Sequence, residues 1–323
     1  MDFRTELKLG RAPFSIDHSS KIFMAGSCFS ENICTKMSEL KFDVCGNPYG
    51  ILFNPASMAS MLSDLAAGRV YARADIRNEN GLWFSWKHHG SFSGADPQEV
   101  LSGINDAAMA GAKALAAADY IILTFGTAWI YRLASTGEVV ANCHKMPAEL
   151  FVRERLTAEG IVDMYAPLFE GVFKGKKVII TVSPVRHLKD GFAENSLSKA
   201  ILRVAAEDLT AVYRNACYFP ALEIVADDLR DYRFYADDMV HPSASAVAYI
   251  WEKFSGWALK ENSREMLPRL EKLSAAMGHK MMRPGGEAGR AFAHKMLSLA
   301  EELQALLPES DFSEEKSYFS SML

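Results

Sequence analysis

The sequence predicts a three-layer α/β fold, in which helices cover both faces of a mostly parallel central sheet, followed by a C-terminal helical extension. Short apolar runs, among them KIFMAG (21–26), DYIILTFG (119–126) and KKVIITVSPV (176–185), alternate with helical patterns of a dozen residues or more. The runs are apolar almost throughout, as is typical of strands buried on both faces. We therefore expect a flavodoxin-like topology, with parallel strands joined by crossover helices.

The bounds of the individual elements follow from apolar periodicity and from helix start and stop residues. Asn54-Pro55 and Gly68 enclose one helix, and Asp96-Pro97 opens another. In chain order we expect strands at 21–26, 42–48, 119–126, 176–185 and 217–225, and hairpins or irregular β segments at 81–94 and 128–145. Helices are expected at 31–41, 54–68, 97–118, 149–173 and 195–215.

The domain organisation follows from length and from the change of pattern near the C-terminus. The chain has 323 residues, of which 49% are hydrophobic, enough for a large core. From residue 242 onward the pattern is helical, with breaks near Lys260 and at RPGGE (283–287). We expect one α/β domain over residues 1–260 and a helical extension over 261–323 that packs on it.

Composition and charge argue against several function classes. The net charge is −5 and no Lys/Arg run occurs, which argues against a nucleic-acid partner. The N-terminus has no apolar signal-peptide core, and Lys113 and Asp119 interrupt the apolar region 107–131, so we expect no membrane association. Five cysteines without a CxxC pair indicate free thiols and a cytoplasmic protein. No compact metal-ligand spacing occurs, and we expect neither a metal nor an organic cofactor.

Polar and glycine-rich residues follow the predicted strands, where ligands bind in open parallel sheets. The first strand ends in Gly26-Ser27-Cys28, and DDMVHPS (237–243) follows the last. Asp238, three residues before His241, can hold one imidazole nitrogen while the other faces a nucleophile, as in a catalytic triad. Taken alone, the same residues also fit a helix cap at Ser27, a small buried Cys28 and a surface histidine.

Many separated motifs make the sequence resemble the GSCFA family, which is grouped by similarity with the SGNH (GDSL-like) hydrolases. The motifs are GSCFS, NPYGILFNP, FSWKHHGSFSG, LTFGTAWIY, NCHKMP, TVSPVRHLKDG, NSLSKA and DDMVHPS, and they cover roughly residues 1–255. The resemblance implies a nucleophile after the first strand and an Asp-His pair in the last loop. It implies the fold and the location of the site more strongly than the substrate.

A departure from the SGNH pattern leaves the nucleophile open. SGNH enzymes carry Gly-Asp-Ser, and aligning Gly26 with that glycine places Ser27 in the Asp position and Cys28 in the Ser position. Either Ser27 attacks from a shifted loop, or Cys28 attacks as a thiolate whose pKa is lowered by the helix N-terminus and a neighbouring histidine. A buried, inert Cys28 is the third alternative.

The oxyanion hole implied by the resemblance also departs from that pattern, which uses the N–H of the nucleophile, a glycine after the second strand and an asparagine. Gly50 or Gly46 matches the glycine, whereas Ala128 stands in the asparagine position. The candidate replacements are Thr127 and Asn142, and the further oxyanion or substrate-binding candidates are Gly126, Arg186 and His187.

These residues favour hydrolysis of an acyl ester through Cys28 or Ser27, with His241 as base and Asp238 as its orienter. Fold analogy alone suggests a carbohydrate-linked ester, so the expected partner is a small-molecule or glycan ester. Two alternatives remain: an acyltransferase that uses the same site, and a non-catalytic module that binds a glycan or a peptide. The missing asparagine favours the non-catalytic alternative.

Overall fold

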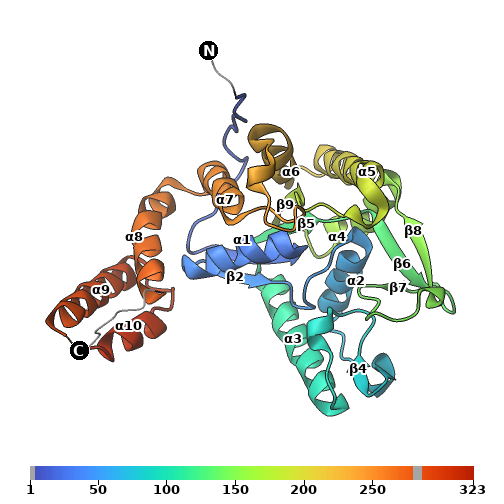
Figure 1. Cartoon of the computed structure of the whole chain (residues 1–323), viewed down its shortest axis with the longest axis horizontal. Helices are drawn as coiled ribbons and strands as arrows, with labels where there is room; N and C mark the ends of the chain where they lie inside the picture. Colours follow the sequence, from blue (N-terminus) through green and yellow to red (C-terminus); the bar gives the residue numbers. More distant parts are fainter. Residues whose placement is uncertain (1–3, 279–285) are drawn as a thin grey trace.

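The computed structural model describes residues 4–278 and 286–323, and at its centre lies a five-stranded parallel sheet. The strands lie in the order β2 (Asp43–Gly46), β1 (Lys21–Gly26), β5 (Tyr120–Phe125), β9 (Lys177–Val182) and β10 (Ala216–Phe219). Helices cover both faces of this sheet (Figure 1). The α/β class predicted from the sequence is therefore confirmed, with the strand order expected for a flavodoxin-like topology.

The alternation of side chains along β1 shows how the sheet separates two cores. Phe23 and Ala25 are buried on one face, and Ile22 and Met24 are buried on the other. The first core is completed by α2 (Pro55–Ala66), α3 (Pro97–Ala117), α4 (Ala158–Glu170) and α5 (Gly191–Val212). The second is completed by α1 (Cys28–Glu39), α6 (Ala221–Glu223) with the π-helix that continues it (Ile224–Leu229), and α7 (Ala244–Ala258).

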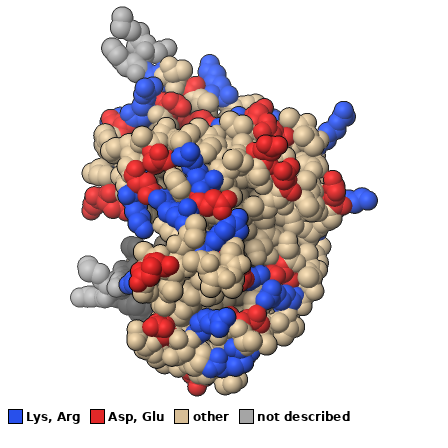
Figure 2. Space-filling model, turned by 90° about the vertical axis from the view of Figure 1, so that its right-hand side faces the viewer, with Lys and Arg blue, Asp and Glu red and all other residues tan. Residues whose placement is uncertain are grey.

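Two small antiparallel sheets and several 3₁₀ turns complete the α/β part. One is the hairpin β3 (Arg77–Glu79)–β4 (Leu82–Phe84), and the other has the order β7 (Val139–Val140), β6 (Trp129–Leu133), β8 (Phe151–Arg155). The 3₁₀ turns are Arg73–Asp75, Gly90–Phe92, Ala148–Leu150, Leu188–Asp190 and Tyr232–Phe234. On the face that Figure 2 shows, Lys and Arg side chains are interspersed with Asp and Glu.

Two expected elements were wrong, and each has a local reason. The segment 149–173 is not one helix, because FVRER forms β8, paired with β6, before α4 begins. The Thr157 hydroxyl accepts a hydrogen bond from the Gly160 N–H (3.0 Å) and starts α4 there. The strand expected at 217–225 stops at Phe219, because Pro220 follows it and α6 begins directly afterwards.

The C-terminal extension consists of α8 (Glu261–Met277), α9 (Glu287–Leu306) and α10 (Ser313–Ser320). It lies beside α1 and β2, at the opposite end of the molecule from β6 and β8 (Figure 1). The mostly buried Lys41 and Glu315 form an ion pair at 2.6 Å that ties α10 to the loop before β2. The expected break near Lys260 is confirmed, since Lys260 precedes the first residue of α8; of the break expected at 283–287, residues 283–285 lie outside the described residues.

In the described part of the chain, no helix is both long enough and apolar enough to cross a bilayer. All five cysteines are free thiols.

Candidate active site

The candidate site lies at the carboxyl ends of β1 and β5, where the chain order of the sheet reverses. β2 pairs with one edge of β1 and β5 with the other, which makes the gap between β1 and β5 the topological switch point. Gly26 ends β1 here, and a Cβ atom at this position would lie only 2.5 Å from the Thr124 carbonyl oxygen. Glycine therefore lets β1 approach β5 closely just before the Ser27-Cys28 bend.

Ser27 and Cys28 occupy different environments at this bend. Ser27 is fully buried, and its hydroxyl has no hydrogen-bond partner among the described residues, so the side chain does not cap α1. It packs against Gly126, where a Cβ atom would approach Ser27 Cβ to 3.3 Å. Cys28 is partly exposed at the first position of α1. Of the two candidate nucleophiles, only the thiol is open to a substrate.

The thiol of Cys28 is not pre-ionised, contrary to the expectation of a lowered pKa. Burial raises its pKa and outweighs the backbone N–H groups of Cys28 and Phe29 and the charge of Lys199, which lower it. The carboxylate of Asp238 raises it further. Attack by this thiol therefore requires a base that removes its proton as the new bond forms.

Asp238 and His241 form the predicted pair. His241 Nδ1 lies 2.7 Å from Asp238 Oδ2, and Asp238 Oδ1 accepts hydrogen bonds from the N–H groups of His241 (3.0 Å) and Val240 (2.9 Å). These contacts lower the pKa of Asp238 to about 2, so it is a carboxylate at neutral pH. Met239 takes a left-handed conformation (φ 58°) inside this turn. The side chain of His241 is 46% exposed, which leaves its ring accessible.

Lys199, which sequence reasoning missed, is the buried cation of the site. It is only 5% exposed, and its ammonium donates hydrogen bonds to the carbonyl oxygens of Gly126 (2.6 Å) and Ser183 (2.8 Å), just after β5 and β9. Burial lowers its pKa to about 7, and the negative charge of an ionised Cys28 raises it again. Lys199 and Cys28 are therefore close enough for their charges to interact.

Three polar residues at helical spacing could have revealed this face of α5. Asn195 accepts a hydrogen bond from the His187 N–H (2.8 Å), Ser198 accepts one from the Ala128 N–H (2.8 Å), and Lys199 follows directly. Residues three and four apart lie on one face of a helix. The motif NSLSKA therefore marks the face of α5 that holds the loops after β5 and β9.

His187, predicted to bind substrate, lies among the residues of this site. The charges of Lys199 and His241 and the carbonyl of Gly126 all act on its ring, and burial, as the main cause, lowers its pKa to about 4. His187 is therefore neutral at physiological pH, and its Nε2 has no hydrogen-bond partner among the described residues. The structure thus brings Cys28, Gly126, Lys199, Asp238 and His241 into one region.

Gly50 and the loop after β5 do not offer free oxyanion donors. The Gly50 N–H donates to the Asn47 carbonyl (2.7 Å), and the N–H groups of Gly126 and Thr127 both donate to the Phe53 carbonyl (2.9 and 2.8 Å). The Thr127 hydroxyl accepts from the Trp129 N–H (3.1 Å). The N–H groups of Gly50 and Thr127 are therefore engaged in this conformation, and the roles of the two residues in the oxyanion hole stay predictions.

Asn142 makes its contacts outside the group around Cys28. Its side-chain oxygen accepts a hydrogen bond from the His144 N–H (2.8 Å), and its amide lies beside Gly90. Asn47 was missed: its side chain accepts from the Gly26 N–H (2.8 Å) and donates to Glu31 (2.6 Å), joining β1 to α1. The N–H groups of Cys28 and Phe29 face the thiol, at the helix N-terminus where backbone donors favour a negative charge.

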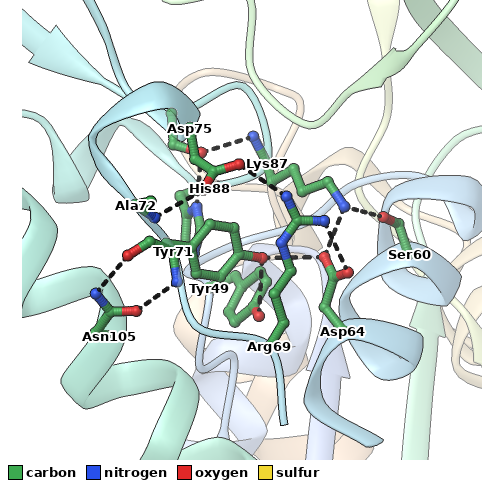
Figure 3. A network of polar contacts seen from close by, with 11 residues as sticks. Tyr49, Ser60, Asp64, Arg69, Tyr71, Ala72, Asp75, Lys87, His88 and Asn105 are labelled. Carbon is green, nitrogen blue, oxygen red and sulfur yellow. Dashed lines mark hydrogen bonds and ion pairs between the residues drawn. The ribbon is translucent and has the colours of Figure 1, made fainter. Parts of the chain in front are cut away.

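A polar network supports the loop that contains Gly50 (Figure 3). At its centre Asp64 of α2 accepts hydrogen bonds from the Tyr71 hydroxyl (3.0 Å) and the Lys87 ammonium (2.7 Å). The hydroxyl oxygens of Tyr71 and Tyr49 lie 3.0 Å apart. Tyr49 stacks on the fully buried His88, with ring centroids 4.2 Å apart. Burial lowers the pKa of His88 to about 3, so the ring packs as a neutral group.

We expect Asp64→Asn to lower the free energy of unfolding by about 1–3 kcal/mol, because Lys87 and Tyr71 then lose a charged acceptor in a mostly buried place. Chemical denaturation of the two proteins measures the difference. The control is Asp106→Asn on the exposed side of α3, which we expect to stay within about 0.5 kcal/mol of the wild type. Equal stability of both variants would show that the network does not stabilise the fold.

No group of three or more His, Cys, Asp or Glu side chains within residues 4–278 and 286–323 is arranged to hold a metal ion.

Comparison with known proteins matches most of the chain to one family. The sequence model of the GSCFA family matches residues 21–254, which run from β1 into α7 and include every site residue described above. A second model, described as the C-terminal domain of GSCFA domain proteins, matches residues 270–323 and thus most of the helical extension. No curated protein matches the sequence. The chain belongs to the GSCFA family.

Proposed function

We propose that the protein hydrolyses an acyl ester, with Cys28 as nucleophile, His241 as base and Asp238 as the residue that orients it. The observation that carries this proposal is the partly exposed thiol at the first position of α1, within reach of the charges of Lys199 and Asp238. A strand–bend–helix nucleophile and an Asp-x-x-His pair are also what a similarity to SGNH hydrolases implies. The accessible thiol and this similarity together favour acyl chemistry over a non-catalytic binding module.

In the first half of the reaction, Cys28 Sγ attacks the ester carbonyl carbon. The S–C bond forms while the thiol proton moves to Nε2 of His241, whose Nδ1 is held by Asp238. The N–H groups of Cys28 and Phe29 stabilise the oxyanion, and the ammonium of Lys199 adds a nearby positive charge. The C–O bond then breaks, the imidazolium gives its proton to the leaving alkoxide, and an acyl thioester remains on Cys28.

In the second half, water attacks the thioester carbonyl and gives a proton to His241. The C–S bond breaks, the carboxylic acid leaves, and the sulfur takes back the proton. If an acceptor alcohol replaces the water, the same site transfers the acyl group instead of hydrolysing it. The two reactions differ only in which hydroxyl enters after the first alcohol has left.

We expect His241→Ala to lower the turnover of a short-chain 4-nitrophenyl ester by about 100- to 10,000-fold, because the reaction then lacks the base that takes the thiol proton in this proposal. Asp238→Asn removes the charge but keeps the size of the side chain, and we expect an intermediate loss. Both side chains are about half exposed, so thermal unfolding should change little. The control is Asp163→Asn on the exposed side of α4, which we expect to leave turnover unchanged.

Three outcomes separate the alternatives. Loss of turnover at unchanged stability supports the proposal, whereas unchanged turnover in His241→Ala would exclude His241 as the base. If the wild type turns over no ester and no thioester, the non-catalytic binding module becomes the better account. The engaged N–H of Gly50 and the Ala at position 128 are the observations that favour that account.

A further inference from the structure

A pocket of about 360 Å³ shares one residue, Lys199, with the candidate site. The Lys199 ammonium donates to the Gly126 carbonyl (2.6 Å), and Gly126 packs against Ser27, the residue before Cys28. Arg186, Asn195 and Tyr235 also line the pocket. Its wall therefore includes a residue of the candidate site, and it is large enough for part of a substrate.

The carboxylates in the wall of this pocket are already engaged elsewhere. Glu223 accepts hydrogen bonds from the Tyr218 hydroxyl (2.9 and 3.1 Å) and pairs with Arg203 (3.4 Å). Asp231 accepts from the Arg233 N–H (2.9 Å) and lies 3.6 Å from the Arg233 guanidinium. Since Arg203 and Arg233 do not line the pocket, they balance these two charges from outside it.

Two basic residues of the wall, Arg186 and Lys199, are not neutralised in this way. In the described part of the chain, neither Arg186 nor Lys199 has a carboxylate within ion-pair distance. Asp227 and Arg230, the other two charged residues of the wall, are both exposed to solvent, which screens their charges. Arg186 is therefore a charged group of the less exposed wall that no carboxylate of the described residues neutralises.

The guanidinium of Arg186 is held in a way that leaves its edge free. Its central carbon lies 3.8 Å from the Tyr235 ring centroid and 5.2 Å from that of Tyr232, and its backbone N–H donates to the Val240 carbonyl (3.1 Å). Stacking uses the flat face of a guanidinium, whereas carboxylates bind at its edge. The side-chain oxygen of Asn195 accepts a hydrogen bond from the His187 N–H (2.8 Å), and the side-chain NH2 group of Asn195 remains as a neutral donor in the pocket wall.

We propose that this pocket binds a carboxylate of the substrate through Arg186, with Lys199 behind it. The inference rests on the proposed function, and it makes the substrate an anionic ester, one that carries a carboxylate a few bonds from the scissile carbonyl. The acyl part and the alcohol part of an ester are both chemically able to supply that group. The recognition is the same in either case, because a planar anion meets a planar, pre-oriented cation.

Matched substrates test this directly. Mono-4-nitrophenyl glutarate and 4-nitrophenyl pentanoate have the same acyl length and differ by a carboxylate on the acyl side; 4-acetoxybenzoate and phenyl acetate differ in the same way on the alcohol side. We expect the wild type to prefer the anionic member of one pair, by kcat/KM, by about 10-fold or more. Arg186→Met should remove that preference, so that both members of the pair are turned over at similar rates. Arg214→Met, in the exposed turn before β10 and outside the pocket, should keep the preference.

A binding measurement separates failure of this inference from failure of the proposed function. By calorimetry, glutarate or 4-hydroxybenzoate should bind to the wild type and to Arg214→Met but not to Arg186→Met, whether or not any ester is hydrolysed. If esters are hydrolysed without preference and neither anion binds, the carboxylate site is excluded while the hydrolase remains. If an anion binds through Arg186 and no ester reacts, the site stands and the chemistry fails.

Discussion

Cys28→Ala is expected to abolish ester turnover, with a loss of at least about 1,000-fold relative to the wild type. The thiol is the partly exposed group at the bend between β1 and α1, and removing it leaves no atom there that can form the acyl bond. The fold should tolerate the change, because the side chain is small and only partly buried. Steady-state kinetics with a 4-nitrophenyl ester and thermal unfolding of the same samples measure both effects.

Ser27→Ala is the matched control for that prediction. Ser27 is fully buried with an unpartnered hydroxyl, so replacing it by alanine removes a buried polar atom and should not lower stability. We expect Ser27→Ala to retain most of the activity. The opposite result, an active Cys28→Ala and an inactive Ser27→Ala, would mean that the loop shifts and that the serine attacks.

Lys199→Met is expected to lower the alkylation rate of Cys28 at pH 6 by about 10-fold, because the positive charge of Lys199 lowers the pKa of the thiol and so favours the thiolate. Methionine keeps the length and the burial of the side chain. Lys176→Met is the control, since the Lys176 ammonium also donates to two carbonyl oxygens, those of Ala116 and Ala118 (both 2.8 Å), beside the amino-terminal end of the sheet. Timed iodoacetamide labelling followed by peptide mass spectrometry gives the rates.

The same variant should change the pH dependence of stability. The pKa of Lys199 is about 7 in the folded protein and has a reference value of 10.5, so between these values the unfolded chain binds one more proton at this position. The free energy of unfolding of the wild type should therefore rise with pH, by up to about 1.4 kcal/mol per unit, relative to Lys199→Met. Parallel stability curves between pH 7 and pH 9 would show that Lys199 is not held in the buried, charge-disfavouring state described here.

Most strands of the central sheet could be predicted from the sequence, because buried parallel strands are recognisable as short, continuous apolar runs. β1, β5 and β9 were predicted to within a few residues, since each is an apolar run bounded by polar residues or glycine. β8 was missed because FVRER, two apolar residues followed by three charged ones, has no strand-like alternation and shortly precedes a helix. Its pairing with β6, a contact that is distant in sequence, decides that it is a strand.

Part of the candidate site could be predicted from the sequence, and there is a physical reason why the rest could not. Cys28, Asp238 and His241 lie in short motifs, in which a spacing of a few residues indicates the chemistry. The raised pKa of Cys28 was not predictable, because burial depends on what packs over the thiol. Lys199 was missed for a similar reason, since a lysine in an amphipathic helix is normally solvated, and only the fold places it under the carbonyl groups of Gly126 and Ser183.

The most direct test of the central claim is to trap the acyl-enzyme. Wild type mixed with a 4-nitrophenyl ester and quenched in acid within the first turnovers should gain the mass of one acyl group, and peptide mapping should place that group on the sulfur of Cys28. His241→Ala should gain it far more slowly under the same conditions. An acyl group on Ser27, or no added mass while the ester is still hydrolysed, would contradict the assignment of Cys28 as the nucleophile.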